Sequence, residues 1–162
     1  MAQNESTDSN KPIGKTPAPQ LQQLNFFKGH WIIEGSNFGA APDGGDSPVT
    51  GEMTNEWITG NFFMSTTWQY HFEAGEHTGF GALGFDETTG DFFVRNYDNL
   101  GYDRRYDISI YKNTWNFTGA QERATMVFDQ AGDSYEENWE ILMDGSWQPL
   151  CRRTGRKAQV TP

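Results

Sequence analysis

The chain has little cysteine, little histidine and few basic residues. Cys151 is the single cysteine among 162 residues, which excludes an internal disulfide framework. With 12 Lys and Arg against 22 Asp and Glu, the formal net charge of -10 repels nucleic acid phosphates and anionic membranes. The start of the chain lacks the apolar core of a secretory signal or of a membrane span. We therefore expect a soluble, cytoplasmic protein that binds neither nucleic acid nor membranes.

Several motifs that carry chemistry are also missing. The sequence has no glycine-rich phosphate loop before a helix, no Gly-x-Ser-x-Gly elbow, no Cys-x-x-Cys pair and no zinc-protease helix. Cys151 has no base near it in the sequence, which favours a packed thiol over a nucleophile. We therefore expect no cofactor, no resident metal ion and no covalent catalysis.

Aromatic residues are plentiful, and they occur in short segments between Gly, Asp and Asn turns. From Trp31 to Arg153 this pattern predicts about ten β-strands and no helix. Nearly every connection has hairpin length, which favours a meander over a Greek key. We therefore predict an all-β fold, a single closed antiparallel up-and-down barrel. The expected strands are 30–38, 49–58, 62–72, 77–85, 92–98, 102–111, 114–118, 124–128, 134–142 and 147–154.

The chain divides into one domain and two tails. Residues 1–18 have no apolar pattern and are expected to form a disordered tail. Residues 19–157 are the expected barrel domain, and residues 158–162 are a short C-terminal tail. Within residues 19–27, PQLQQLNFF, leucines recur at three-residue spacing behind a proline, and Gly29 follows. This spacing predicts a short helix that caps one end of the barrel.

One group of motifs resembles a known family. Residues 24–35, LNFFKGHWIIEG, contain the Gly-x-Trp signature of lipocalin-like, or calycin, barrels. Together with GALGFDETTGDFFVRNYDNLG and a late DGSW leading to CRRTGRK, they resemble the bacterial family of unknown function DUF1579. The resemblance implies a lipocalin-like barrel in which Trp31 plugs the closed end. The related nitrobindin barrels hold haem through a late histidine, but no histidine follows His77 here, so no haem ligand is carried over.

A closed barrel of this size is expected to enclose a cavity. In the strand predicted at 62–72, alternation places Trp68 and Tyr70 on one face. Trp139, on the strand predicted at 134–142, is expected to join them. Such a wall suits a small hydrophobic or aromatic ligand, although ordinary core packing explains these side chains equally well.

Four polar residues are candidates for binding the polar end of such a ligand. Arg95 and Tyr97 share a face of one predicted strand, and Arg104 and Tyr106 share a face of the next. An arginine inside a barrel would meet an anionic or carbonyl-bearing ligand. The alternative is that each arginine pairs with a neighbouring carboxylate and has a structural role.

Three residues are candidates for catalysis: Tyr70, His71 and Glu137. His71 and His77 flank one hairpin turn, where a histidine would serve as a general base at the cavity mouth. Two histidines beside Glu73 and Glu76 do not supply the converging ligands of a good zinc site. Burial of Glu137 beside Trp139 would raise the pKa of its carboxyl group, as an acid catalyst requires.

Two functions of different classes remain open at this point. The first is a carrier or binding protein whose cavity holds a small hydrophobic or aromatic molecule. The second is a cofactor-independent enzyme, of isomerase or cyclase type in specialised metabolism, that moves one proton with a Tyr, His or Glu. An entirely apolar interior would favour carriage, and a hydrogen-bonded His, Glu or Tyr would favour catalysis. The sequence also leaves open whether the chain forms a homodimer.

Overall fold

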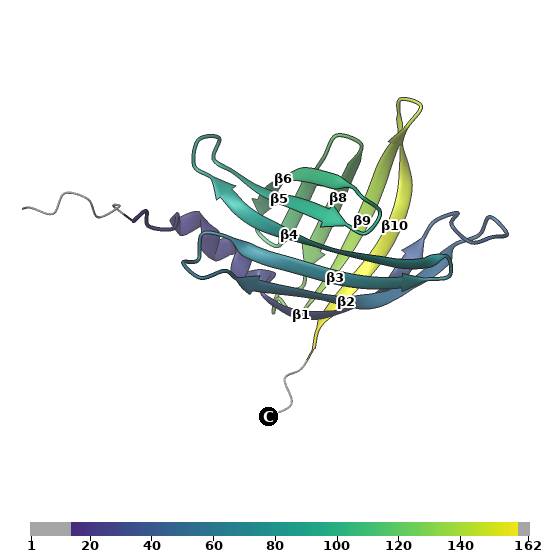
Figure 1. Cartoon of the computed structure of the whole chain (residues 1–162), viewed down its shortest axis with the longest axis horizontal. Coiled ribbons are helices and arrows are strands. Elements are labelled where there is room, and N and C mark those ends of the chain that lie inside the picture. The colour runs from purple at the N-terminus through teal and green to yellow at the C-terminus, as the bar shows by residue number, and fades with distance from the viewer. Residues whose placement is uncertain (1–13, 159–162) are drawn as a thin grey trace, which may run out of the picture.

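The computed structural model describes residues 14–158 and shows ten strands closed into one antiparallel barrel (Figure 1). Each strand pairs with the next along the chain, and β1 pairs with β10. The predicted fold class is confirmed. One 3-10 helix, η1 (Pro19–Phe26), precedes the barrel. The strands are β1 (Gly29–Asn37), β2 (Ser47–Trp57), β3 (Met64–Phe72), β4 (Gly75–Asp86), β5 (Asp91–Asp98), β6 (Asp103–Tyr111), β7 (Thr114–Thr118), β8 (Glu122–Phe128), β9 (Ser134–Met143) and β10 (Ser146–Lys157).

The tails expected from the sequence fall largely outside this range. Residues 1–13 of the first tail and 159–162 of the second are not among the described residues. Within residues 14–158, no helix is long and apolar enough to cross a membrane.

The turns follow from the residues that form them. In the β9–β10 hairpin, Asp144 and Gly145 both have positive φ angles, of 49° and 76°. Two successive positive φ angles suit the right-handed twist of a tight hairpin, and Asp-Gly is a favoured pair there. The turn sets Leu142 opposite Trp147 in the ladder.

One irregularity in β10 decides which residues face the interior. The β9–β10 register shifts between Pro149 and Cys151, so that Glu137 lies opposite Arg153. Pro149 has no N–H to donate to the ladder, which is why proline is tolerated at such a bulge. Without the shift, the hairpin turn would place Glu137 opposite Arg152 instead. The bulge therefore selects which of the two adjacent arginines lies inside.

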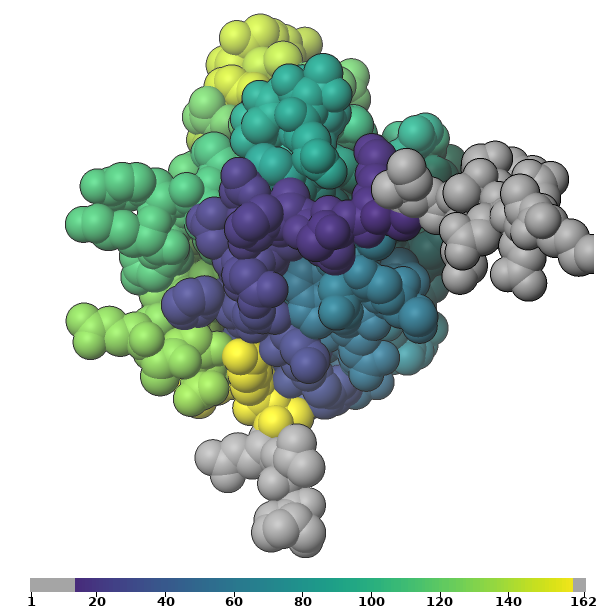
Figure 2. Space-filling view, turned by 90° about the vertical axis from the view of Figure 1, so that its left-hand side faces the viewer, coloured from purple at the N-terminus to yellow at the C-terminus, as the bar shows by residue number. Residues whose placement is uncertain are grey.

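The helix η1 lies across one end of the barrel, as Figure 2 shows in purple. Leu21 and Leu24 are buried, and their three-residue spacing matches the period of a 3-10 helix. The helix is fixed at its C-terminal end by the carbonyl group of Phe27, which accepts hydrogen bonds from two buried side chains. Trp31 Nε1 donates at 2.8 Å and Asn55 Nδ2 at 3.0 Å. The predicted capping helix is confirmed.

Beneath η1 lies a packed group of aromatic rings that we call the closed-end cluster. Its ring centroids lie 5.0 to 6.2 Å apart, the range of favourable tilted and edge-to-face pairs. Trp31 is completely buried within it, which is the position that the family resemblance implied. The members are Phe27, Trp31, Trp115, Phe128 and Tyr135.

Candidate functional site

The rest of the barrel interior contains a cavity of about 370 Å³. Phe27 of the closed-end cluster lines it on one side. At the other end of the barrel, Phe38 and Ala40 from the segment after β1 and Leu100 from the β5–β6 turn also line it. The volume falls within the usual range of small-molecule sites. The interior is therefore filled by side chains at one end only.

Aromatic side chains from several strands form much of the cavity wall. Trp68 and Tyr70 come from β3, Tyr106 from β6, and Phe117 and Trp139 from β7 and β9. The ring of Trp139 lies 5.2 Å from Tyr106 and 5.9 Å from Phe117, measured between centroids. Alternation along the strands predicted the inward position of Trp68, Tyr70, Tyr106 and Trp139.

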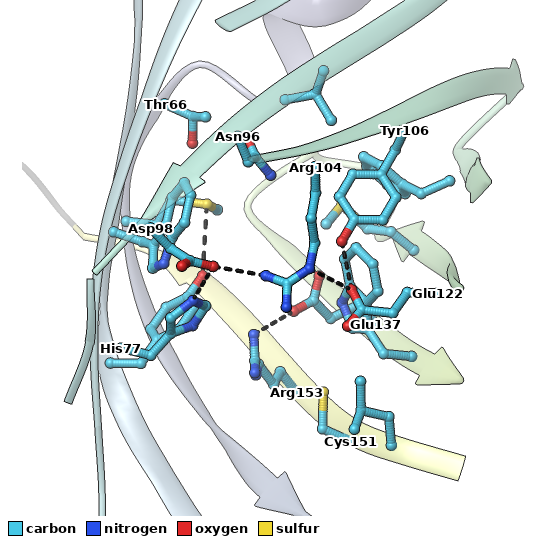
Figure 3. Close-up of a pocket in the computed structure, with 18 of the residues that line it drawn as sticks. Thr66, His77, Asn96, Asp98, Arg104, Tyr106, Glu122, Glu137, Cys151 and Arg153 are labelled. Carbon is cyan, nitrogen blue, oxygen red and sulfur yellow. Dashed lines mark hydrogen bonds and ion pairs between the residues drawn. The ribbon is translucent and has the colours of Figure 1, made fainter. Parts of the chain in front are cut away.

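A hydrogen-bonded group around Arg104, here the Arg104 cluster, occupies one side of the cavity (Figure 3). Arg104 Nη1 donates to Asp98 Oδ2 at 2.6 Å, and its Nε lies 3.7 Å from Glu122 Oε2. His77 Nε2 lies 3.2 Å from the same Asp98 oxygen. The Tyr106 hydroxyl donates to Glu122 Oε2 at 2.5 Å. Both carboxylates thus have partners besides the guanidinium.

The surroundings of Asp98 and Tyr106 shift the pKa values of these two groups in opposite directions. Burial opposes ionisation of Asp98, but the N–H groups of Tyr102 and Leu100 and the ring of His77 donate to it, and together they hold its pKa below the usual value. For Tyr106, burial and then the Glu122 carboxylate raise the pKa of the hydroxyl far above its usual value. Tyr106 therefore stays protonated and acts as a donor.

A second polar group, the Arg153 pair, comes from β9 and β10. Arg153 Nη1 lies 3.8 Å from Oε1 of Glu137, its cross-strand neighbour. The guanidinium lies 4.6 Å from the centroid of the Tyr70 ring. Burial raises the pKa of Glu137, although the charge of Arg153 opposes this shift. Burial also raises the pKa of the adjacent Cys151 thiol to about 11, so the thiol is protonated at neutral pH.

Three of the predicted site residues lie on the outer surface. The predicted inward position of Arg95 and Tyr97 is therefore wrong, and so is the predicted place of His71 at the cavity mouth. The His71 ring is half-exposed and its Nδ1 lies 3.1 Å from Glu76 Oε1. Arg95 donates to the Asp103 carboxylate at 2.7 and 3.0 Å, also in an exposed pair. Tyr97 is 39% exposed. The pairing of Arg95 with a neighbouring carboxylate is the structural alternative left open by the sequence.

The cause of these errors is the alternation of strand faces. A strand directs successive side chains to opposite sides, so a mistaken choice of face misplaced both Arg95 and Tyr97, whereas adjacent residues such as Tyr70 and His71 cannot both face the cavity. In β5, Asn96 and Asp98 line the cavity, and therefore Arg95 and Tyr97 do not. In β3, Tyr70 faces inward, and His71 must face outward.

Sequence reasoning also missed four charged or titratable residues of the cavity, namely His77, Asp98, Glu122 and Arg153. His77 was predicted to flank a hairpin turn at the cavity mouth together with His71, and only His71 was chosen as a site residue; yet His77 lies directly opposite Tyr70 and shares its inward face. A register count from the β3–β4 turn contains that signal. Glu122 starts a strand rather than ending a turn.

The chemistry available in this cavity is proton donation and ion binding. The Tyr106 hydroxyl stays protonated, burial favours the protonated form of Glu137, and two guanidinium groups can bind an anion or a carbonyl group. Among residues 14–158, no three His, Cys, Asp or Glu side chains are grouped in a way that would hold a metal ion.

Comparison with known proteins places the chain in a family. The model described as "Protein of unknown function (DUF1579)" matches residues 16–135. Rv2717c from M. tuberculosis has a similar structure, with a TM-score of 0.67, 16% identity, and coverage of 88% of this chain and 99% of that one. The S-type phycobiliprotein lyase CPES from Guillardia theta has a TM-score of 0.54, 10% identity, and coverage of 86% and 93%. No curated protein matches. The chain belongs to the DUF1579 family and has a lipocalin-like barrel fold.

Proposed function

We propose that the protein binds a small molecule with a hydrophobic or aromatic body inside the barrel. The observation that carries this proposal is the aromatic-walled cavity of about 370 Å³ beside an interior that is otherwise closely packed. Trp68, Tyr70 and Trp139 offer flat, largely apolar surface in the same wall. An empty apolar space in a small barrel costs stability, which a bound ligand would recover.

Two further considerations support this proposal. The lipocalin-like fold is common to this chain and to a protein named a phycobiliprotein lyase, although at 10% identity the likeness concerns the fold alone. The single cysteine is buried and free, which favours the reducing cytoplasm as the place where the ligand is met.

A neutral aromatic probe tests the proposal. N-phenyl-1-naphthylamine fluoresces strongly in apolar sites, and it accepts energy from tryptophan. We expect saturable binding that quenches tryptophan emission, with a lower affinity for the probe in Trp68→Phe because that ring lies in the wall. Trp147→Phe is the matched control, since Trp147 lies outside the cavity, where its ring contacts Arg123. Absence of binding, or equal changes in both variants, would contradict the proposal.

A second candidate is the cofactor-independent isomerase or cyclase, and the Arg104 cluster favours it. The interior is not entirely apolar, and it contains a tyrosine hydrogen-bonded to a carboxylate and a histidine beside another. Such pairs suit proton transfer to or from a bound substrate. Tyr70 and Glu137 remain candidate catalytic residues of this second function, as the sequence predicted.

The two candidates differ in whether a bound molecule is converted. Cell extract incubated with the protein and analysed by mass spectrometry would show a new isomer under the enzyme hypothesis. Tyr106→Phe should then abolish conversion and retain binding of the probe, because only the hydroxyl is lost. Tyr111→Phe, at a side chain that is 72% exposed, should leave conversion unchanged. Unchanged extracts would leave carriage as the function.

A further inference from the structure

The two arginines of the cavity differ in how well their charges are compensated. Arg104 has Asp98 Oδ2 at 2.6 Å and Glu122 Oε2 at 3.7 Å, and its guanidinium lies 3.9 Å from the centroid of the Tyr102 ring. Arg104 is therefore held by two carboxylates that are both fixed by further hydrogen bonds. A ligand anion would have to compete with them.

Arg153 is held much more weakly. Its side chain is 15% exposed, and the Glu137 carboxylate is 3.8 Å away, near the outer limit of an ion pair. The Nε atom of Arg153 is buried and has no hydrogen-bond partner within residues 14–158. A buried donor without a partner is costly, and native proteins rarely leave one. Because the Arg153 side chain also lines the cavity, an anionic ligand there would meet a guanidinium group whose charge is incompletely compensated.

The charges around Arg153 also leave its own charge weakly compensated. The titratable groups that face it are Glu137 and Tyr135 from β9, Tyr70 from β3 and Cys151 from β10. Burial raises the pKa of all four groups. The two tyrosines and the thiol therefore stay neutral, and burial disfavours the charged form of Glu137 that would pair with Arg153. Arg153 itself keeps its charge, because a guanidinium group stays protonated in proteins throughout the working pH range.

The indole N–H group of Trp68 is buried and also lacks a hydrogen-bond acceptor among the described residues. An indole N–H only donates, so its partner must be an oxygen or another acceptor. The amide oxygen of Asn96 is unpartnered as well, and an amide can present its N–H₂ group instead by turning over.

We propose that Arg153 is the anion-binding residue of the cavity, and that the ligand is an amphiphilic anion with an aromatic or apolar body and one carboxylate or comparable acidic group. This inference rests on the proposed function and adds the chemical class of the ligand. The acidic group meets the Arg153 guanidinium, and the body lies against Trp68 and Trp139. Charge-assisted hydrogen bonds to a guanidinium are among the strongest polar contacts available to a ligand.

The test compares two probes that differ by one charged group. 8-Anilinonaphthalene-1-sulfonate has the ring system of N-phenyl-1-naphthylamine plus a sulfonate that stays ionised throughout the working pH range. For the unaltered protein we expect the anionic probe to bind about tenfold or more tightly than the neutral one. Because this ratio needs no substitution, it tests the proposal even if a variant fails to fold.

Two adjacent arginines give a matched pair of variants. Arg153→Gln should remove the preference for the anionic probe and leave the neutral probe bound, and Arg153→Lys should restore part of the preference. Arg152→Gln should change neither affinity, because Arg152 lies on the outside and pairs with Glu136 at 3.0 Å. Circular dichroism and the Tm show whether each variant is folded.

The outcomes separate this inference from the proposed function. If the neutral probe binds and Arg153→Gln leaves the preference for the anion intact, the assignment of Arg153 is overturned and the cavity remains a binding site. Loss of the preference in Arg104→Gln rather than in Arg153→Gln would move the anion site to the Arg104 cluster. If neither probe binds, both proposals fail.

Discussion

The two ends of the barrel interior are built from the same strands but serve different purposes. At the closed end the inward side chains are aromatic rings in mutual contact, and Trp31 and Asn55 both donate to one carbonyl group. Towards the other end the inward positions include two arginines, three carboxyl groups and a histidine around a cavity. Alternation along the strands therefore sets which residues face inward, whereas the volume and charge of those side chains decide whether the barrel interior is filled.

Replacing one tryptophan at each end by alanine should give the largest difference in stability between the two ends. Trp31→Ala removes a completely buried ring and should lower the free energy of unfolding by about 3–5 kcal/mol. Trp68→Ala only enlarges an existing cavity and should cost about 1 kcal/mol. Urea denaturation followed by circular dichroism measures both. Equal losses would mean that the cavity end is packed as tightly as the closed end.

Asp98→Asn tests the electrostatic side of the comparison. The substitution keeps the shape and removes the charge that pairs with Arg104, which should cost about 2 kcal/mol at neutral pH. The pKa of Asp98 is lowered by folding, so its contribution is present above the unfolded value of about 3.9 and is lost as the pH falls below it. The stability difference from the unaltered protein should therefore shrink in acid.

The control for this prediction is Asp107→Asn. Asp107 pairs with Arg105 on the outer surface, where both side chains are at least half-exposed. Exposed pairs contribute little, so its urea midpoint should barely move. A larger loss for Asp107→Asn than for Asp98→Asn would contradict the importance given to the Arg104 cluster.

Gly79→Ala should displace the Trp68 ring, which is part of the cavity wall. A Cβ atom at this position would overlap the Trp68 ring and come 2.5 Å from the carbonyl oxygen of Tyr97. We expect a loss of about 1–2 kcal/mol and weaker binding of the neutral probe, because the indole must move. Gly14→Ala, where nothing lies within 4 Å, is the control. Unchanged probe affinity in Gly79→Ala would show that Trp68 does not contact the ligand.

Glu137→Gln should have the smallest effect on stability and the clearest dependence on pH. Folding raises the pKa of Glu137. The contribution of this group to the free energy of unfolding is therefore complete below its unfolded-state pKa of about 4.3, and it is lost as the pH rises through the pKa of the folded state. The Tm of the variant should therefore fall less than that of the unaltered protein between about pH 4.5 and pH 7. Glu136→Gln, in an exposed pair, should keep the original slope. Parallel slopes for Glu137→Gln and the unaltered protein would contradict the raised pKa.

The barrel could be predicted from the sequence because its determinants are local. Aromatic segments of strand length and hairpin turns such as Asp144-Gly145 indicated ten antiparallel strands, and the structure has ten. The wall residues Trp68 and Trp139 followed from alternation within strands whose inward face carries mostly aromatic and apolar side chains. Where both faces of a strand carry polar or aromatic residues, as around Arg95, alternation gives two answers and only the closed barrel chooses between them.

Arg153 illustrates what a local pattern cannot supply. Counting back from the turn at Asp144-Gly145 puts Arg152 opposite Glu137, and the one-residue bulge after Pro149 puts Arg153 there instead. A proline hints at an irregularity but does not show on which side of it the register resumes. The residue that we assign to the ligand therefore depends on a single shift in the ladder.

The most direct test of the central claim is native mass spectrometry of the freshly purified chain. We expect a fraction of the protein molecules to carry the added mass of a small molecule. This molecule should be released on denaturation and should ionise as an acid. The same fraction should disappear in Arg153→Gln and persist in Arg152→Gln. A chain that is always recovered at its bare mass, and that also leaves both naphthalene probes unbound, would contradict a ligand-binding cavity.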